Sequence, residues 1–235
     1  MTNSVNTVRL YPKAWLWMTL AAAVIFAGFF QSFFSKLQQT DLSHHLHGIS
    51  ATLWLLLLIV QPFLYSRSNI SLHRKLGKIS FVLVPLLLIG GLRMVYIMLN
   101  SQDNYPPLVT YKLSFLDFFY MIQFTIFYIL AIVHRKNIQL HPRYMAATVL
   151  VLIPPGLARL LGLFPVFTSF DAVLNTSYYI LEFVIILLLI DDYRRGKIQI
   201  PYAVAFVCAL LQNLLLNYIH LWEPWRKLMD KFAAL

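Results

Sequence analysis

The sequence has few charged residues and a single cysteine. Only 12% of its 235 residues are Asp, Glu, Lys or Arg, whereas 60% are hydrophobic, and the mean hydropathy is +0.69. This small number of charges cannot cover a water-facing surface. The composition therefore excludes an ordinary soluble domain and indicates a membrane protein. One thiol cannot form an internal disulfide, and we interpret Cys208 as a small core residue.

The sequence also lacks several motifs that would assign a chemistry. It contains no G-x-x-x-x-G-K-[ST] loop, no G-x-G-x-x-G turn and no H-E-x-x-H segment. Nucleotide binding and zinc-protease chemistry are therefore not supported. The last apolar segment contains no lysine that could bind retinal.

The apolar residues form seven segments, each about as long as a helix that crosses roughly 30 Å of hydrocarbon. The predicted spans are 14–35, 46–65, 79–99, 113–133, 144–164, 173–190 and 201–221. No remaining segment could form a soluble domain. We therefore predict an all-α, seven-transmembrane helix bundle that makes residues 1–235 a single integral membrane domain.

Lysine and arginine gather at alternate ends of the predicted spans. With a cytoplasmic N-terminus, the inner segments hold 12 of the 19 basic residues: Arg9, Lys13, Arg67, Arg74, Lys75, Lys78, Arg135, Lys136, Arg143, Arg194, Arg195 and Lys197. Basic loops stay in the cytoplasm, which predicts an inner-membrane protein with its N-terminus inside and its C-terminus outside. The net charge of +10 then reflects topology and attraction to anionic lipid headgroups on the cytoplasmic side, without a nucleic-acid partner.

Two of the predicted cytoplasmic turns share a sequence pattern. RSNISLHRK, from Arg67, and RKNIQLHPR, from Arg135, coincide at five positions, and RGKIQIPY, from Arg195, resembles both but has Pro201 in place of the histidine. We infer one helix followed by three repeated helical hairpins. Parallel repeats of this kind relate to one another about an axis along the membrane normal, so the three turns should lie at equal depth.

The repeated turns place His73 and His141 at equivalent positions on the inner side. Two histidines on neighbouring helices could be axial ligands of a haem b. Alternatively, the basic residues around them could bind lipid phosphate at a helix N-terminus. The third interpretation is a turn motif that serves folding alone.

The remaining conspicuous histidines belong to the outer side. They are His44, His45, His47 and His220. Asp41 or Ser43 could cap the second span, which would place His44 and His47 on one helical face. Neutral imidazole is a common ligand of divalent metals, so these histidines are candidate metal ligands, or else polar residues that mark a helix end.

Four ionisable residues fall inside predicted spans: Arg93, Asp117, Arg159 and Glu182. By helix count all four lie in the outer half of the membrane. Each would cost roughly 2.5 to 3.5 kcal/mol near a helix centre, so the two cations and two anions are expected to compensate one another inside the bundle.

This polar network has two interpretations. Buried ion pairs could simply fix how the helices pack. Alternatively, the network could be the floor of a polar cavity, open to the outside and rimmed by the four outer histidines. Adjacent prolines, Pro154 and Pro155, favour the cavity, because they interrupt backbone hydrogen bonding where a helix bends around one.

Three histidine motifs each open an apolar span: HLHG from His45, HRKLG from His73 and HPRYM from His141. In this respect residues 40–200 resemble a largely uncharacterised family of bacterial multi-pass membrane proteins with H-x-H-G, H-R-x-L-G and H-K-R-L-M motifs. The resemblance implies no established reaction, and Pro142 and Pro201 depart from the pattern. The histidine usage is more distantly similar to that of four-helix assembly factors of haem-copper oxidases, which implies haem or copper.

Two main functions follow as expectations. The first is a membrane protein with a histidine-rimmed outer cavity that binds a metal or haem for redox or oxidase-assembly work. The second is a carrier or receptor for a small molecule or ion that uses no cofactor. A structural subunit that binds another membrane protein is a third class.

Overall fold

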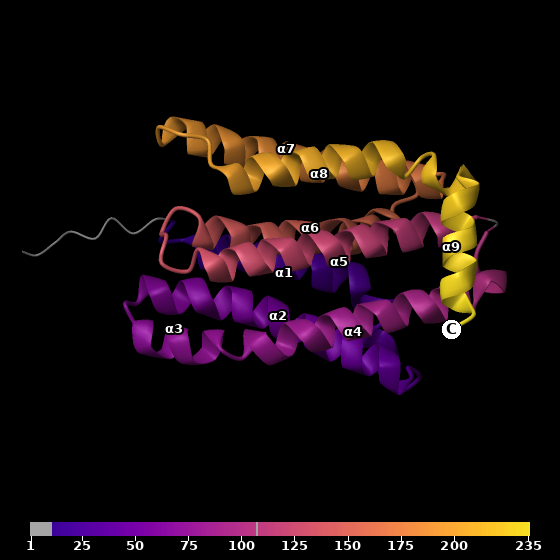
Figure 1. Ribbon diagram of the computed structural model, residues 1–235, viewed down its shortest axis with the longest axis horizontal. Helices are drawn as coiled ribbons and strands as arrows, with labels where there is room; N and C mark the ends of the chain where they lie inside the picture. Colours follow the sequence, from indigo (N-terminus) through magenta and orange to yellow (C-terminus); the bar gives the residue numbers. More distant parts are fainter. Residues whose placement is uncertain (1–10, 107) are drawn as a thin grey trace, which may run out of the picture.

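The computed structural model describes residues 11–106 and 108–235, and all regular elements in these residues are helices (Figure 1). They are α1 (Ala14–Phe30), η1 (Phe34–Lys36), α2 (Leu42–Ser66), α3 (Ile70–Gly77), α4 (Ser80–Leu99), η2 (Gln102–Asn104), α5 (Val109–Val133), α6 (His141–Leu161), α7 (Phe170–Arg194), α8 (Ile200–Leu215), η3 (Ile219–Leu221) and α9 (Glu223–Ala233).

Five helical segments are long and apolar enough to cross a membrane: α2, α3 together with α4, α5, α6 and α7. Two further apolar helices are shorter, with 17 residues in α1 and 16 in α8. The all-α architecture is thus confirmed, with five segments that are suited to crossing a membrane. A crossing by all seven segments remains a prediction.

The observed helix bounds differ from the predicted spans in a consistent direction. Several helices begin before the apolar segment does, because polar residues cap them: Asp41 accepts a hydrogen bond from the backbone of His44, and Asn69 from that of Leu72. Hydropathy cannot detect such polar first turns, and for the same reason it missed α3. In contrast, α8 ends at Leu215 rather than at residue 221.

Neighbouring helices pack as antiparallel pairs in chain order: α2 with α4, α5 with α6, and α7 with α8. The first helix, α1, packs against both α6 and α2. Its contact with α6 is very close at Gly28, where a Cβ atom would lie 1.9 Å from the carbonyl oxygen of Gly156. Small residues commonly permit this kind of approach between membrane helices.

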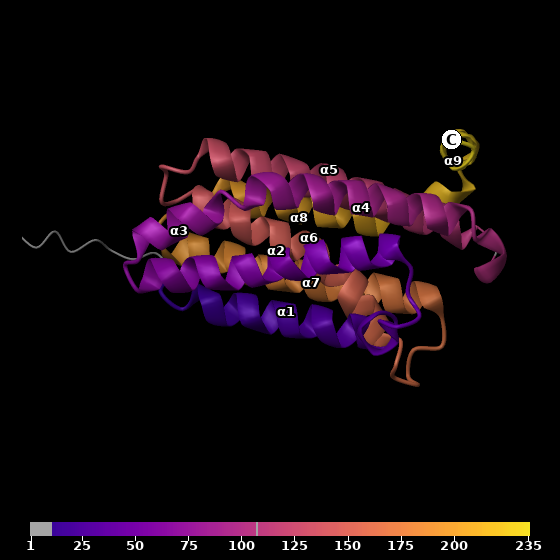
Figure 2. The ribbon, with the colours of Figure 1, turned by 90° about the horizontal axis from the view of Figure 1, so that it is seen from below.

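The three turns with the shared sequence pattern lie at the same end of the bundle, as their predicted equivalence requires (Figure 1). We call this end, formed by residues 67–69, 134–140 and 195–199, the basic end. The opposite end carries α9, which lies across the other helices (Figures 1 and 2), and we call it the α9 end.

The α9 helix is amphipathic and packs on the ends of α4 and α5. Met229 is buried against Val95 and Leu99. Trp225 donates its indole N–H to the carbonyl oxygen of Tyr111 at 2.8 Å. The sequence of α9 is rich in charged residues and contains no apolar segment, so hydropathy does not predict this helix.

Candidate functional site

The repeated turns at the basic end have the same hydrogen bonds. The side-chain oxygens of Asn69 and Asn137 accept from the backbone N–H groups of Leu72 and Leu140, both at 3.2 Å. Each asparagine carbonyl accepts from the backbone N–H four residues later, at 3.0 Å in both turns. The repeated asparagine therefore starts the next helical turn in both places.

The repeated histidine ties each new helix to the one before it. His73 Nδ1 lies 3.3 Å from the carbonyl oxygen of Gln61, and His141 Nδ1 lies 2.8 Å from that of Ala131. A carbonyl can only accept, so Nδ1 carries the proton and the lone pair stays on Nε2. The two imidazoles are within electrostatic range of each other. This geometry gives the histidines a folding role and leaves two nitrogen ligands free.

Two outer histidines make local contacts near the start of α2. His44 Nδ1 lies 2.9 Å from the carboxylate of Asp41, which also accepts from the His44 backbone. That backbone hydrogen bond lowers the pKa of the Asp41 carboxyl. His45 Nε2 lies 3.1 Å from the Thr40 hydroxyl. Both histidines therefore belong to the capping structure of this helix.

The other two outer histidines have different surroundings. His47 packs on α4, where a Cβ on Gly90 would lie 3.1 Å from it. His220 is within electrostatic range of Lys112 and Asp171. Within residues 11–106 and 108–235, no three His, Cys, Asp or Glu side chains are grouped closely enough to hold a metal ion.

The four intramembrane charges do not form one network. Asp117 and Arg159 are within electrostatic range of each other, but they make no ion pair within 4.0 Å. Arg159 instead donates to the carbonyl oxygen of Pro155 at 2.9 Å. Arg93 is exposed on α4. Glu182 belongs to another polar cluster, whose Tyr120 and Tyr178 are within electrostatic range of Asp117.

Glu182 is buried, with 9% of its side chain exposed. Its carboxylate accepts a hydrogen bond from Asn213 Nδ2 at 3.0 Å, and no base lies within ion-pair distance of it in the described part of the chain. One helical turn away, the hydroxyl of Tyr178 lies 2.6 Å from that of Tyr120. These four side chains join α5, α7 and α8, and we call them the Glu182 cluster.

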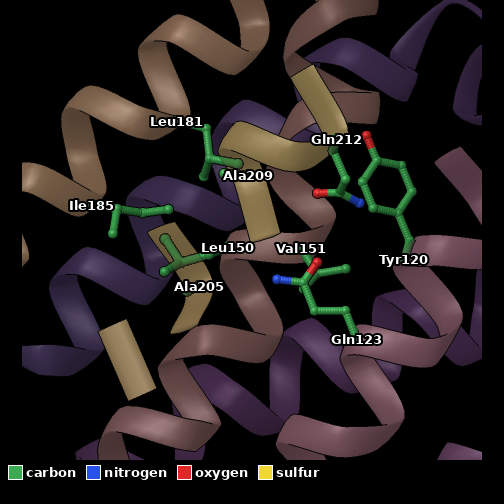
Figure 3. Close-up of a pocket in the computed structure, with 9 residues that line it drawn as sticks. All are labelled: Tyr120, Gln123, Leu150, Val151, Leu181, Ile185, Ala205, Ala209 and Gln212. Carbon is green, nitrogen blue, oxygen red and sulfur yellow. The ribbon is translucent and has the colours of Figure 1, made fainter. Parts of the chain in front are cut away.

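A small cavity lies beside this cluster, between α5, α6, α7 and α8 (Figure 3). Its volume of about 10 Å³ is close to the minimum that one water molecule needs. Gln123, Gln212 and Tyr120 line it, with Leu181 and Ile185 among the apolar residues that complete the wall.

Unpartnered polar atoms gather at the cavity and the cluster. Gln123 Oε1, Gln212 Nε2 and Asn213 Oδ1 are buried and have no hydrogen-bond partner among residues 11–106 and 108–235. A buried polar atom without a partner costs free energy, and most of all inside a membrane. The region is therefore equipped to accept a single water molecule.

Polar residues continue from the cluster to the α9 end. Asn175 and Asn217 exchange side-chain hydrogen bonds of 3.2 and 3.1 Å. The ammonium of Lys112, which is buried, lies 2.5 Å from the Asp171 carboxylate. On α7 the polar residues 171, 175, 178 and 182 follow a three- to four-residue spacing, which places them on one helical face.

A second polar cluster lies at the basic end. The sequence analysis does not predict it. Arg143 on α6 donates to Asp192 on α7 from Nε at 2.8 Å and from Nη2 at 2.6 Å. Gln139 accepts from the same guanidinium at 2.9 Å, and the Tyr11 hydroxyl accepts from it at 3.1 Å. Burial raises the pKa of the Tyr11 hydroxyl. We call this set the Arg143 cluster.

Comparison of the chain with protein-family models, with curated protein sequences and with solved structures finds no match. The fold and the buried polar site define the class only, which is an all-α membrane protein. The resemblance suggested by the histidine motifs stays a prediction.

Proposed function

We propose that this protein is a membrane carrier that binds a proton or a small cation at the Glu182 cluster. The observation that carries the proposal is the buried Glu182 carboxyl with an amide as its hydrogen-bond partner. An ionised carboxylate in a membrane interior needs a compensating positive charge. A bound proton or cation supplies that charge where no lysine or arginine does.

The chemistry of the cluster and of the neighbouring cavity suits such an occupant. Asn213 Oδ1 in the cluster and Gln123 Oε1 in the cavity wall are buried oxygens without partners in the described part of the chain, and Glu182 adds a carboxylate. Oxygen ligands of this kind suit hard cations. The polar face of α7, which continues through Asn175 to Asp171, supplies a route between the cluster and the α9 end.

The topology that goes with this proposal follows the positive-inside rule. We propose that all seven apolar helices cross the cell membrane, with the basic end in the cytoplasm and the α9 end outside. The cytoplasmic bases then face anionic headgroups. The polar route of α7 would open outwards, toward the outside medium.

Binding is tested by the thermal stability of the purified full chain at several concentrations of Na⁺, K⁺ and Li⁺ and at several pH values. A cation that binds the folded state at a hundredfold excess over its Kd should stabilise it by about 2.7 kcal/mol. If a proton is the occupant, stability should fall as pH rises, because an uncompensated charge then stays buried.

Glu182→Gln keeps the shape of the side chain and removes the ionisable group, so this variant should lose the cation or pH dependence. Glu223→Gln, on the exposed first turn of α9, is the matched control and should keep it. The proposal fails if the wild type responds to neither cations nor pH, or if Glu182→Gln responds as the wild type does.

A second candidate function rests on the histidines at the basic end. With Nδ1 of His73 and of His141 tied to backbone carbonyls, both Nε2 atoms are arranged as in histidines that bind metals. A metal ion or haem shared by the two would favour the redox or assembly role. Elemental analysis and a visible spectrum of the purified protein test it, with His141→Ala expected to lose the signal and His134→Ala to keep it.

A further inference from the structure

An apolar groove runs along the surface between α4 and α5, with a volume of about 340 Å³. Its walls are Leu88 and Leu92 from α4 and Phe118, Met121, Ile122, Thr125 and Ile126 from α5. We call it the α4–α5 groove. Both helices are long and apolar enough to cross a membrane, so we expect the groove to face lipid.

One basic residue of α4 lies close in the chain to the α9 end of the groove. Arg93 follows the groove residue Leu92 directly, is exposed, and places its guanidinium carbon 4.9 Å from the centre of the Tyr96 ring. It forms no ion pair with any residue that the structure describes. An unpaired arginine at this depth needs an anionic partner or contact with the headgroup layer.

The depth of Arg93 fits a lipid headgroup. It lies six residues before the end of α4 at Leu99, or about 9 Å along the helix axis. Long basic side chains near helix ends extend toward the interface. From Leu92 the groove runs along the helix axes toward the middle of α4 and α5. An acyl chain takes the same direction below its headgroup.

The α9 helix borders the same end of the groove. Its Trp225 and Phe232 pack on Phe118, a groove residue, and Phe232 also packs on Tyr96. Lys231, the neighbour of Phe232, is exposed. Ring contacts thus connect Arg93, through Tyr96 and Phe232, to the groove residue Phe118.

We propose that the α4–α5 groove binds one acyl chain of an anionic phospholipid, whose phosphate is held by Arg93. The Arg93 guanidinium and the apolar walls match the two parts of such a molecule. Phosphatidylcholine carries the same phosphate, but its choline cation offsets that charge, so an anionic lipid should bind better. A helix from a second copy of the chain would offer Arg93 no phosphate.

The test is mass spectrometry of the intact full chain in detergent, with added dioleoyl-phosphatidylglycerol or dioleoyl-phosphatidylcholine. The wild type should prefer phosphatidylglycerol about fivefold, the effect of one basic residue near a membrane surface. Arg93→Gln should lose the preference and Arg93→Lys should keep most of it. Lys36→Gln, an exposed base near the same end but outside the groove, should match the wild type.

A groove variant separates the headgroup from the acyl chain. Ile122→Trp fills the groove without changing charge, so it should reduce binding of both lipids and leave the thermal stability nearly unchanged. An unchanged preference in Arg93→Gln would overturn the proposal. So would wild-type lipid binding in Ile122→Trp, or a lipid-free dimer that Ile122→Trp abolishes, which would show a second copy in the groove.

Discussion

The side chains of Arg143 and Asp192 link α6 to α7 through an ion pair with an Nη2 to Oδ1 distance of 2.6 Å and side-chain exposures of 1% and 0%. The other carboxylate oxygen of Asp192, Oδ2, accepts a hydrogen bond from the backbone N–H of Gln199 at 3.1 Å. The pair therefore fixes the turn before α8 as well as the two helices that carry it. Removing one partner would leave the other as a buried, uncompensated charge.

We expect Asp192→Asn to lower the free energy of unfolding by about 3 to 5 kcal/mol, the usual cost of breaking a buried pair. The double variant Asp192→Asn with Arg143→Met should lose less than the two single variants together. Asp191→Asn is the control, because its pair with Arg195 is exposed and should contribute at most about 1 kcal/mol. Unfolding in detergent measures all four, and equal losses for Asp192→Asn and Asp191→Asn would contradict the expectation.

The sequence alone indicates only one residue of this pair. Arg143 belongs to the basic residues that predict the topology, and their distribution gives it no partner. The available signal was that Asp191 and Asp192 are the only carboxylates in the predicted cytoplasmic segments, among 12 bases. A carboxylate next to an excess of bases is a candidate for pairing, but which base lies closest depends on tertiary packing.

The close contact of α1 with α6 predicts that Gly28→Ala is destabilising. The added methyl group would overlap the Gly156 carbonyl, so we expect a loss of about 1 to 3 kcal/mol. Gly162→Ala is the matched control, because its Cβ would make only tight to ordinary contacts of 3.4 and 3.6 Å. A Gly28→Ala protein as stable as the control would mean that α1 does not pack here.

The cap at the start of α2 predicts a pH-dependent contribution from Asp41. Since the backbone N–H of His44 lowers the carboxyl pKa in the folded state, the stabilisation is complete above the unfolded pKa of about 3.9 and disappears as pH falls through the folded value. Asp41→Ala should therefore be less stable than the wild type at pH 7, with a gap that closes in acid. Asp103→Ala, in the exposed η2 turn, should differ little at either pH. A gap that widens in acid would contradict the cap.

The proposed orientation predicts where reporters are active. A reporter inserted at Asn69 should be active only in the cytoplasm, because this turn belongs to the basic end. Reporters inserted at Asp103 or fused to the C-terminus should be active only outside. Activity on the same side at Asn69 and at the C-terminus would mean that an even number of helices crosses the membrane between them, instead of the five from α4 to α8, and would contradict the seven-helix topology.

The spacing of the histidines near the start of α2 does not by itself distinguish metal ligands from residues that cap the helix. Histidines spaced three apart near a helix start suggested metal ligands, but the ring of His44 is used locally by Asp41 and that of His45 by Thr40. Glu182, in contrast, was found from hydropathy alone. Its partner Asn213 and the cluster residue Tyr120 are not predicted, because they come from α8 and α5, and the sequence does not reveal how these helices are rotated relative to α7.

The most direct test of the carrier proposal is flux through the full chain reconstituted in phosphatidylcholine and phosphatidylglycerol vesicles. A pH-sensitive dye, or ²²Na⁺ inside the vesicles, would follow movement of a proton or a cation under an imposed membrane potential. We expect flux above that of empty vesicles for the wild type and for Glu223→Gln, and flux at the empty-vesicle level for Glu182→Gln with its folded yield unchanged. Wild-type flux no greater than that of empty vesicles, or equal flux in Glu182→Gln, would contradict the account.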